Sequence, residues 1–150
     1  MTAAEIRRAT LADVPAIVAL IADDQLGTTR ESLDDLTPYA EAFAALDADP
    51  HQLLIVADRN GEVVGTFQLT FIPGLSRRGS WRAQIEAVRV APSTRGTGLG
   101  STLMQWAIDE SRRRGCALVQ LTSDKTRTDA HRFYTTLGFT MSHEGFKLTL

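Results

Sequence analysis

The sequence predicts a mixed α/β fold built as one domain, and three observations indicate it. Its 150 residues are the length of a single domain, and 43% hydrophobic with 23% charged residues is an ordinary globular composition. Apolar runs in the middle of the chain are separated by turn signals, which predicts antiparallel hairpins. A strand, a helix and a further strand follow, and such a crossover joins parallel strands. We therefore expect a mixed, mostly antiparallel sheet of six to seven strands with helices on both faces.

The first third of the chain predicts one strand and two helices. The segment Glu5–Ala9 has the pattern of a short strand. Thr10 or Asp13 can cap the helix that follows. The apolar positions of that helix have helical spacing and are Val14, Ile17, Val18 and Ile21. A second helix is expected over Leu33–Leu46, with an interruption near Pro38.

The middle of the chain predicts three antiparallel strands. Leu53–Ala57 and Val63–Ile72 have the composition of strands, and Asn60-Gly61 between them is the strongest short signal for a hairpin. Ser80–Val90 has the pattern of a third, longer strand. These runs give the sheet its antiparallel part.

A helix and a buried strand come next. Leu99–Arg114 carries apolar residues on one broad side and polar residues on the other, which indicates an amphipathic helix. Gly115 is placed to end that helix. Ala117–Leu121 is a short apolar run typical of a buried parallel strand.

The end of the chain predicts one more helix and two short strands. The helix is marked by residues at helical spacing, namely Ala130, Phe133, Tyr134 and Leu137. Gly138 is placed to end it. Phe139–Met141 and Phe146–Leu150 have strand-like patterns and would complete the sheet.

Composition excludes several classes of protein. The net charge of −2 gives no general case for nucleic-acid binding. The lone cysteine, Cys116, excludes an internal disulfide and a cysteine-rich zinc site, and we expect no metal. No stretch approaches the ~20 apolar residues of a membrane helix, and the N-terminus lacks the apolar core of a signal peptide. These features predict a cytoplasmic protein with no membrane partner.

The most informative segment is the glycine-rich turn between Val90 and the helix that starts at Leu99. Gly96, Gly98 and Gly100 place bare backbone N–H groups at a helix N-terminus. Such N–H groups lack partners within the helix, and the helix dipole favours negative charge there. Because Arg95 adds a full positive charge, the segment predicts a phosphate-binding site.

Three kinds of phosphate loop compete for this segment. A Walker loop requires a lysine that does not follow Gly100. A dinucleotide-binding fingerprint requires a glycine where Ser101 stands. The pattern Arg-x-x-Gly-x-Gly is met in full by Arg95, Gly98 and Gly100. Alone, this motif also suits a turn that merely packs a helix on a sheet.

Two segments together resemble a known family. Residues 85–104, Ile-Glu-Ala-Val-Arg-Val-Ala-Pro-Ser-Thr-Arg-Gly-Thr-Gly-Leu-Gly-Ser-Thr-Leu-Met, are similar to the acetyl-CoA-binding motif of the GNAT family of N-acetyltransferases. Residues 130–139, Ala-His-Arg-Phe-Tyr-Thr-Thr-Leu-Gly-Phe, resemble the motif that follows it in that family. The expected element order also matches. The resemblance implies a GNAT fold over residues 1–150, with the sheet splayed between its fourth and fifth strands.

The resemblance also implies how acetyl-CoA is held. The pantetheine arm would lie in the splay, against backbone groups of Val88 and Val90, with the pyrophosphate on the backbone N–H groups of residues 95–101. The residues implied in cofactor binding are Val88, Arg89, Val90, Arg95, Gly96, Thr97, Gly98, Leu99, Gly100, Ser101, Arg127 and Phe133. Many members of the family carry an asparagine at the position of Arg127. The contact of that side-chain amide with the cofactor is therefore a point where this sequence departs from the family pattern.

The implied chemistry is attack of an amine on a thioester. An alkylammonium has a pKa near 10.4 and must first lose a proton. Glu86 is the candidate base, since it lies in an apolar strand two residues before Val88 and is therefore expected on the same face. The N–H of Val88 is expected to polarise the thioester carbonyl. The resemblance gives Tyr134 the role of the acid that protonates the leaving thiolate.

The acceptor is left open by conflicting signals. Residues 1–50 carry a net charge of −7, which suits a cationic amine such as a polyamine or aminoglycoside. Arg77 and Arg78, in the loop before Ser80–Val90, suit an acceptor with an anionic group. Residues 128–134 with Ser142-His143 resemble the aminoalkylphosphonate acetyltransferase branch of the family. We expect the primary amine of a small molecule, which is a polyamine, an aminoglycoside, an amino acid or an aminoalkylphosphonate-like compound. A homodimer is implied by the family alone.

Two alternatives stay open at this point. One is a non-catalytic acyl-CoA-binding or sensing module on the same fold, which the presence of both Glu86 and Tyr134 disfavours. The other is a protein acetyltransferase that modifies lysine side chains or N-termini.

Overall fold

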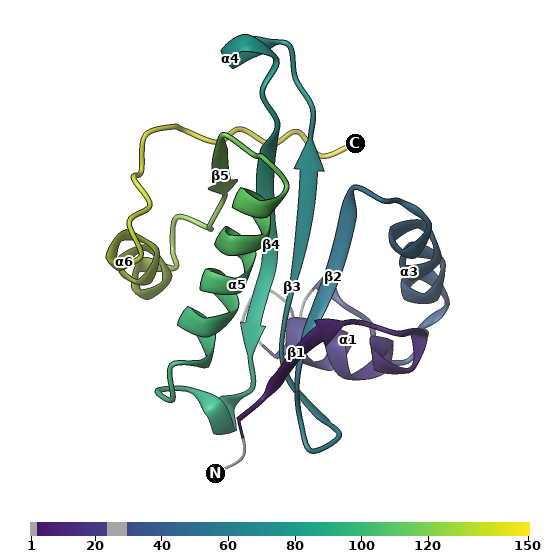
Figure 1. Cartoon of the computed structure of the whole chain (residues 1–150). Helices are drawn as coiled ribbons and strands as arrows, with labels where there is room; N and C mark the ends of the chain where they lie inside the picture. Colours follow the sequence, from purple (N-terminus) through teal and green to yellow (C-terminus); the bar gives the residue numbers. More distant parts are fainter. Residues whose placement is uncertain (1–2, 24–29) are drawn as a thin grey trace. The chain divides into compact units, whose positions relative to one another are not determined.

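A computed structural model describes residues 3–23 and 30–150 of the chain. Two compact units are formed, Met1–Gln120 and Leu121–Leu150. The described strands make one sheet in the order β1-β2-β3-β4-β5 (Figure 1). The chain order of the strands and their spatial order therefore coincide. No helix in the described ranges has the length and apolar character needed to cross a bilayer.

Four of the strands are antiparallel neighbours. They are β1 (Glu5–Arg8), β2 (Gln52–Arg59), β3 (Glu62–Ile72) and β4 (Arg82–Val90). The turn between β2 and β3 has positive φ at both central residues, 54° at Asn60 and 87° at Gly61. That is the hairpin geometry the Asn-Gly pair predicts, since its twist matches that of the strands. The prediction of the central hairpins is confirmed.

The fifth strand, β5 (Leu118–Leu121), lies beside β4. The backbone N–H of Ala117 donates to the carbonyl of Trp81 at 2.8 Å, and the Gln120 amide donates to Gln84 at 2.9 Å. Both contacts advance along the two strands in the same direction, so β4 and β5 run parallel. The crossover that the sequence predicts is therefore present.

Helices cover both faces of this sheet. On one face, α1 (Val14–Ala22) and α3 (Thr37–Ala48) pack around Val56 of β2 through Ile17 and Phe43. On the other face, α5 (Leu99–Arg113) packs on β3, with the Trp106 ring 5.9 Å from that of Phe67. Figure 1 shows α5 running along β3 and β4. The predicted placement of helices on both faces is confirmed within this unit.

One local prediction needs correction, and one loop has more structure than the sequence indicates. The second helix begins at Thr37 and not at Leu33, with Pro38 in its first turn. Proline suits that position, because the first N–H groups of a helix have no partner to lose. The hairpin between β3 and β4 also carries a short turn, α4 (Ser76–Gly79), whose Arg77 and Arg78 are left-handed at φ 54° and 61°.

The second unit holds α6 (Thr128–Thr136), which Gly138 ends at φ +100° as expected. Residues 139–150 form no strand, so the predicted arms Phe139–Met141 and Phe146–Leu150 are wrong and the sheet has five strands instead of six to seven. Alternating apolar residues favour a strand but do not supply its hydrogen-bonding neighbour. Phe146 and Leu148 accordingly remain 94% and 87% exposed.

Candidate active site

The centre of β4 contains a β-bulge. Thr66 of β3 pairs with Arg89, and Gln68 pairs with Glu86. One residue of β3 therefore faces two of β4, Ala87 and Val88, and Ala87 takes a left-handed φ of 53°. A bulge of this kind leaves the extra residue outside the ladder and bends the strand. It therefore frees backbone hydrogen-bonding groups in the middle of β4.

The bulge overturns one part of the sequence argument. Glu86 and Val88 are two residues apart and were expected on one face, but the extra residue between them interrupts the two-residue period. The side chain of Glu86 instead belongs with the regular row before the bulge. Nothing in the sequence marks this point, because the left-handed position is filled by an alanine and not by a glycine.

Beyond the bulge, the edge of β4 is open in the described sheet. Trp81 and Gln84 contact Ala117 and Gln120, so β5, which stops at Leu121, ends at about the level of Ile85. Val88, Arg89 and Val90 run past that end, and all three are half-buried. A row of backbone N–H and C=O groups along such an edge can pair with an extended, amide-containing ligand.

The turn after β4 leads directly into α5. Its first part is held internally, since the backbone N–H groups of Arg95 and Thr97 donate to Pro92 and Thr94. Those two N–H groups are therefore not available to a phosphate, contrary to the sequence prediction for residues 95–101. The side chain of the buried Thr94 donates to Ala91 at 2.8 Å and fixes this part of the turn.

The second part of the turn presents free donors. Gly98 caps α5 in a left-handed conformation at φ 86°, and the first backbone bond of the helix runs from Thr102 to Gly98 at 3.0 Å. The N–H groups of Leu99, Gly100 and Ser101 therefore lack partners within the helix. A Cβ built on Gly96 or Gly98 would meet nothing within 4 Å. These glycines leave an unobstructed approach, and the site fits a pyrophosphate.

Glu86 lies in a row of polar side chains on the sheet face opposite α5. Its Oε1 accepts a hydrogen bond from the Gln84 amide at 3.1 Å, and Gln84 in turn accepts one from Gln120 at 2.9 Å. Glu86 is exposed and has no ion pair among the described residues. An exposed carboxylate without a cationic partner, held by an amide, is suited to receive an ammonium group.

The predicted residues of the second unit lie on and before α6. Tyr134 is half-buried, with its ring 5.4 Å from Phe133 and 6.1 Å from Phe139. Arg127 precedes the first turn of α6, and its carbonyl accepts the N–H of His131 at 3.1 Å. Tyr134 thus sits in an aromatic setting that fixes its ring.

Cys116 shows no sign of a nucleophile. It is half-buried, and desolvation raises the pKa of its thiol, so the reactive thiolate is disfavoured at neutral pH. It lines a small cavity together with Trp81 and Arg114, at the opposite end of β4 from Val90. The expectation that Cys116 has no catalytic role stays a prediction.

An open strand edge that leads into a glycine-capped helix defines a class of protein that binds an extended ligand ending in phosphates. Residues 18–139 match the family model described as "Acetyltransferase (GNAT) family". The chain belongs to this family, and it is an acetyl-CoA-dependent N-acetyltransferase.

Two relatives are named as N-acetyltransferases, and a solved structure shares the fold. An aminoalkylphosphonate N-acetyltransferase of Salmonella typhimurium is 36% identical over 100% of this chain and 94% of its own length. A glucosamine 6-phosphate N-acetyltransferase of Trypanosoma brucei brucei is 37% identical over 60% of this chain and 59% of its own length. The crystal structure of a transcriptional regulator from Bacillus halodurans C-125 superposes with a TM-score of 0.95 and 47% identity, covering 98% of this chain and 99% of that one.

Proposed function

We propose that residues 1–150 act as one catalytic domain that transfers the acetyl group of acetyl-CoA directly to the primary amine of a small molecule. The observation that carries this proposal is the continuity of one surface. The bulge at Ala87, the open edge from Val88 to Val90 and the free N–H groups after Gly98 follow one another along the chain. This surface fits a pantetheine arm that ends in a pyrophosphate.

Glu86 and Val88 have separate proposed roles in that reaction. Acetyl-CoA supplies the acetyl group as a reactive thioester when it is bound. Glu86 accepts the proton that the ammonium must lose before it can attack. The N–H of Val88, at the bulge, hydrogen-bonds the thioester oxygen as negative charge develops on it. A bond forms between the amine nitrogen and the acetyl carbon, and the carbon–sulfur bond breaks.

The leaving thiolate needs a proton, and Tyr134 is the proposed donor. The aromatic contacts to Phe133 and Phe139 hold its ring while leaving the hydroxyl as the polar end of the side chain. Phe133 and Arg127 keep their proposed places beside acetyl-CoA, and Arg95 adds positive charge near the phosphates.

The acceptor proposed first is an aminoalkylphosphonate. The relative that spans the whole chain is named for that substrate class, and the second relative is named for an amine that bears a phosphate. Both names describe a molecule that combines an amine with an anionic group. Polyamines and aminoglycosides, which lack such a group, take second place.

The proposed function is tested in two steps with the purified chain. Calorimetric titration with acetyl-CoA, with NAD as control, should show binding to acetyl-CoA alone. Thiol release is then followed with 2-aminoethylphosphonate as acceptor. Glu86→Gln should reduce kcat by about 100-fold or more, since general-base catalysis contributes about that factor. Acetyl-CoA affinity should stay unchanged, because Glu86 lies before the bulge.

Glu62→Gln, which alters an exposed carboxylate at the start of β3, is the matched control and should leave both quantities unchanged. Acetyl-CoA binding without acetylation of any amine would favour the non-catalytic acyl-CoA-binding module. Acetylation of lysine side chains or N-termini of proteins, with small amines inert, would favour the protein acetyltransferase. Failure to bind acetyl-CoA would contradict the proposal.

A further inference from the structure

A strip of polar side chains crosses the sheet face opposite α5, and it begins at Glu86. In the regular part of β4 before the bulge, every second residue faces this side, which places Arg82, Gln84 and Glu86 in one row. Gln68 pairs with Glu86, and Thr70 pairs with Gln84, from the neighbouring β3. We call these five residues the polar strip: Arg82, Gln84, Glu86, Gln68 and Thr70.

Side-chain hydrogen bonds order the strip from both sides. Gln52 of β2 accepts from the Gln68 amide at 3.0 Å and from the Thr70 hydroxyl at 2.8 Å. Gln120 of β5 donates to Gln84, which donates to Glu86. Four adjacent strands thus supply two hydrogen-bonded groups of polar side chains, one around Gln52 and one around Gln84, that lie side by side. A sheet face built this way favours a polar ligand over an apolar one.

The strip carries one charge of each sign. Glu86 lies at one end and Arg82 at the other, and neither has an ion pair among the residues that the structure describes. Four residues of extended strand separate them, which is ~13 Å between their Cα atoms. The Arg82 guanidinium lies toward Gly74, on the side away from Glu86, so the two charged groups do not pair with each other.

We propose that Arg82 binds the anionic group of the acceptor while Glu86 receives its amine, an inference that rests on the proposed function. A small molecule that carries both an amine and a phosphonate, phosphate or carboxylate offers one group to each of these opposite charges. The amide of Gln84 lies between the two ends. The amine then sits next to the bulge, where the acetyl group is delivered.

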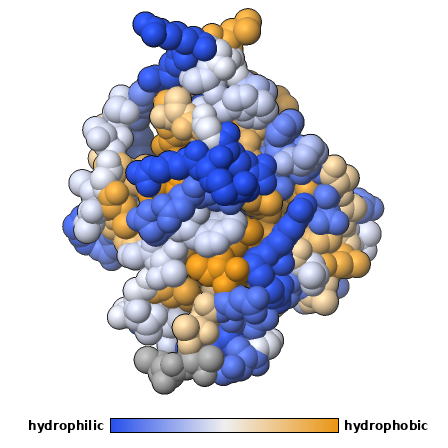
Figure 2. Space-filling model, in the orientation of Figure 1, coloured by the Kyte–Doolittle hydropathy of each residue, from blue (hydrophilic) through white to orange (hydrophobic). Residues whose placement is uncertain are grey.

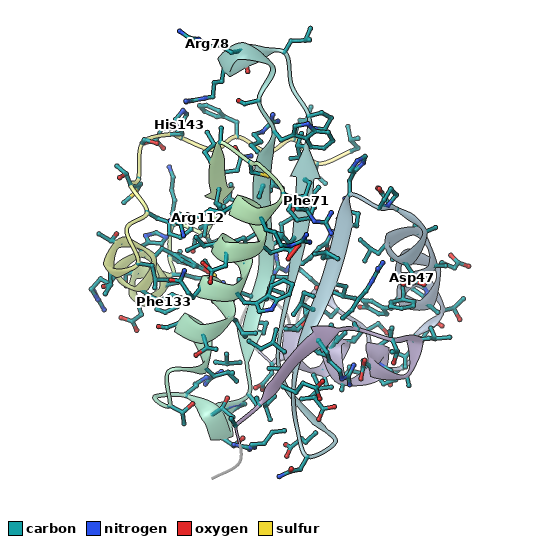
Figure 3. The ribbon with its side chains drawn as sticks, viewed as in Figure 1. Asp47, Phe71, Arg78, Arg112, Phe133 and His143 are labelled. Carbon is teal, nitrogen blue, oxygen red and sulfur yellow. The ribbon has the colours of Figure 1, made fainter. Side chains whose placement is uncertain are left out.

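Two observations favour Arg82 over the arginines that the sequence singles out. Arg77 and Arg78 lie in α4, beyond Arg82 and further from Glu86 along the hairpin. Figure 3 shows Arg78 at that tip, and Figure 2 shows a hydrophilic projection there beside a hydrophobic one. The Arg82 guanidinium instead lies beside Gly74, where a Cβ would come within 3.4 Å of its Nη1. Gly74 thus leaves it room.

The test compares three amines that differ in their second group: 2-aminoethylphosphonate, β-alanine and n-propylamine. With the wild-type chain, we expect lower KM for the two anionic amines, and the ratio between them tells phosphonate from carboxylate recognition. Arg82→Gln should raise KM for the preferred anionic amine about 10- to 100-fold, as expected for loss of a charge-assisted hydrogen bond. The kcat, the Kd of acetyl-CoA and the KM of n-propylamine should not change.

Two further variants keep the result interpretable. Arg82→Lys should restore part of the affinity, because the charge is kept while the planar fork is lost. The double variant Arg77→Gln/Arg78→Gln removes two nearby charges outside the strip and should leave KM unchanged. A similar loss in the double variant would assign the effect to general electrostatics and overturn the role of Arg82.

Failure of this inference differs from failure of the proposed function. Acetylation of amines with equal KM for all three, or an Arg82→Gln variant that weakens n-propylamine equally, overturns the inference and leaves the acetyltransferase intact. A wild-type chain that binds acetyl-CoA but acetylates none of the three amines, and no polyamine or aminoglycoside, overturns both.

Discussion

At the scale of single residues, the proposed site depends on charged side chains that have few interaction partners within the protein. Glu86 accepts a hydrogen bond from one neutral amide and has no ion pair among the described residues, so its charge is available to the proposed amine. Arg7 is the opposite case, because it is committed to both Asp13 and Asp58. A charged side chain is therefore available for ligand recognition, as we propose for Glu86, or stabilises the fold, as Arg7 does. The difference follows from how many partners the backbone brings within reach.

Tyr134→Phe tests the proposed acid. The change removes only the hydroxyl, and the contacts of the ring with Phe133 and Phe139 are kept. We expect kcat to fall by about 100-fold, as for loss of a general acid, with the Kd of acetyl-CoA unchanged. Steady-state kinetics and titration calorimetry measure the two quantities.

The other tyrosine supplies the control. The Tyr39 hydroxyl bonds Glu31 at 3.0 Å, far from β4 in the chain, so Tyr39→Phe should leave kcat unchanged. A wild-type kcat in Tyr134→Phe would remove the acid role, and the proton would have to reach the sulfur from water.

At the scale of elements, Gly98 and Gly115 make a matched pair at the two ends of α5. Both are left-handed, at φ 86° and 79°, and a Cβ on either meets nothing within 4 Å. Gly98→Ala and Gly115→Ala should therefore each cost about 1 kcal/mol in free energy of unfolding. Only Gly98→Ala should weaken acetyl-CoA binding, by about tenfold or more, because only that Cβ enters the approach to the free N–H groups. Equal Kd values for the two variants would contradict a phosphate site at the N-terminus of α5.

Gly65 allows α5 to pack closely against the sheet. A Cβ there would come within 2.9 Å of Leu103 Cδ1, and Leu103 is fully buried. Gly65→Ala should therefore destabilise the fold by about 1–3 kcal/mol through overpacking, measured by urea unfolding. Leu103→Val in the same chain should recover part of that loss by making room. Gly145→Ala, with open space around it, should stay within about 0.5 kcal/mol. If Gly65→Ala left the free energy of unfolding unchanged, α5 would be able to shift on the sheet without cost.

These elements also show what a sequence can predict. The hairpin at Asn60-Gly61 and the ends of helices at Gly115 and Gly138 were predictable, because each needs a left-handed residue that glycine or asparagine tolerates. The bulge at Ala87 uses the same conformation without such a residue. Only pairing with β3 imposes it, and pairing is not visible in a local pattern.

The candidate site also has features that the sequence predicts and features that it does not. The glycine turn follows from its motif, whereas the spacing that singles out Glu86 places it on one face with Val88, which the bulge at Ala87 prevents. Arg82 gains its proposed role from standing in the row of Glu86, which requires the register of β4 against β3. The Arg95 and Thr97 N–H groups are used by local bonds to residues three positions earlier, which the glycine motif does not specify. Long-range pairing therefore accounts for the bulge and for the row of Arg82, and local turn geometry accounts for the rest.

At the scale of the whole molecule, one cluster of charges ties distant segments of the first unit together. Arg7 of β1 donates to Asp13, before α1, at 2.8 and 3.0 Å, and to Asp58 of β2 at 3.0 and 3.2 Å. Asp13 also accepts the N–H of Thr10 at 2.7 Å, and its side chain is only 9% exposed. The hydrogen bonds from Arg7 lower the pKa of Asp13 to about 2.

This depressed pKa predicts how the fold responds to acid. The folded state binds the Asp13 proton more weakly than the unfolded chain, whose pKa is near 3.9, so the stabilisation is fully present above about pH 5 and is lost as pH falls through 2. Asp13→Asn should therefore cost about 2 kcal/mol at pH 7, and about half of that at pH 3. Urea unfolding of both proteins at each pH measures the difference. Asp47→Asn breaks only an exposed pair with Arg8 at 3.6 Å and should cost under about 1 kcal/mol at either pH. A difference between wild type and Asp13→Asn that does not shrink at pH 3 would show that the carboxyl stabilises the fold through its shape and neutral hydrogen bonds, and not through its charge.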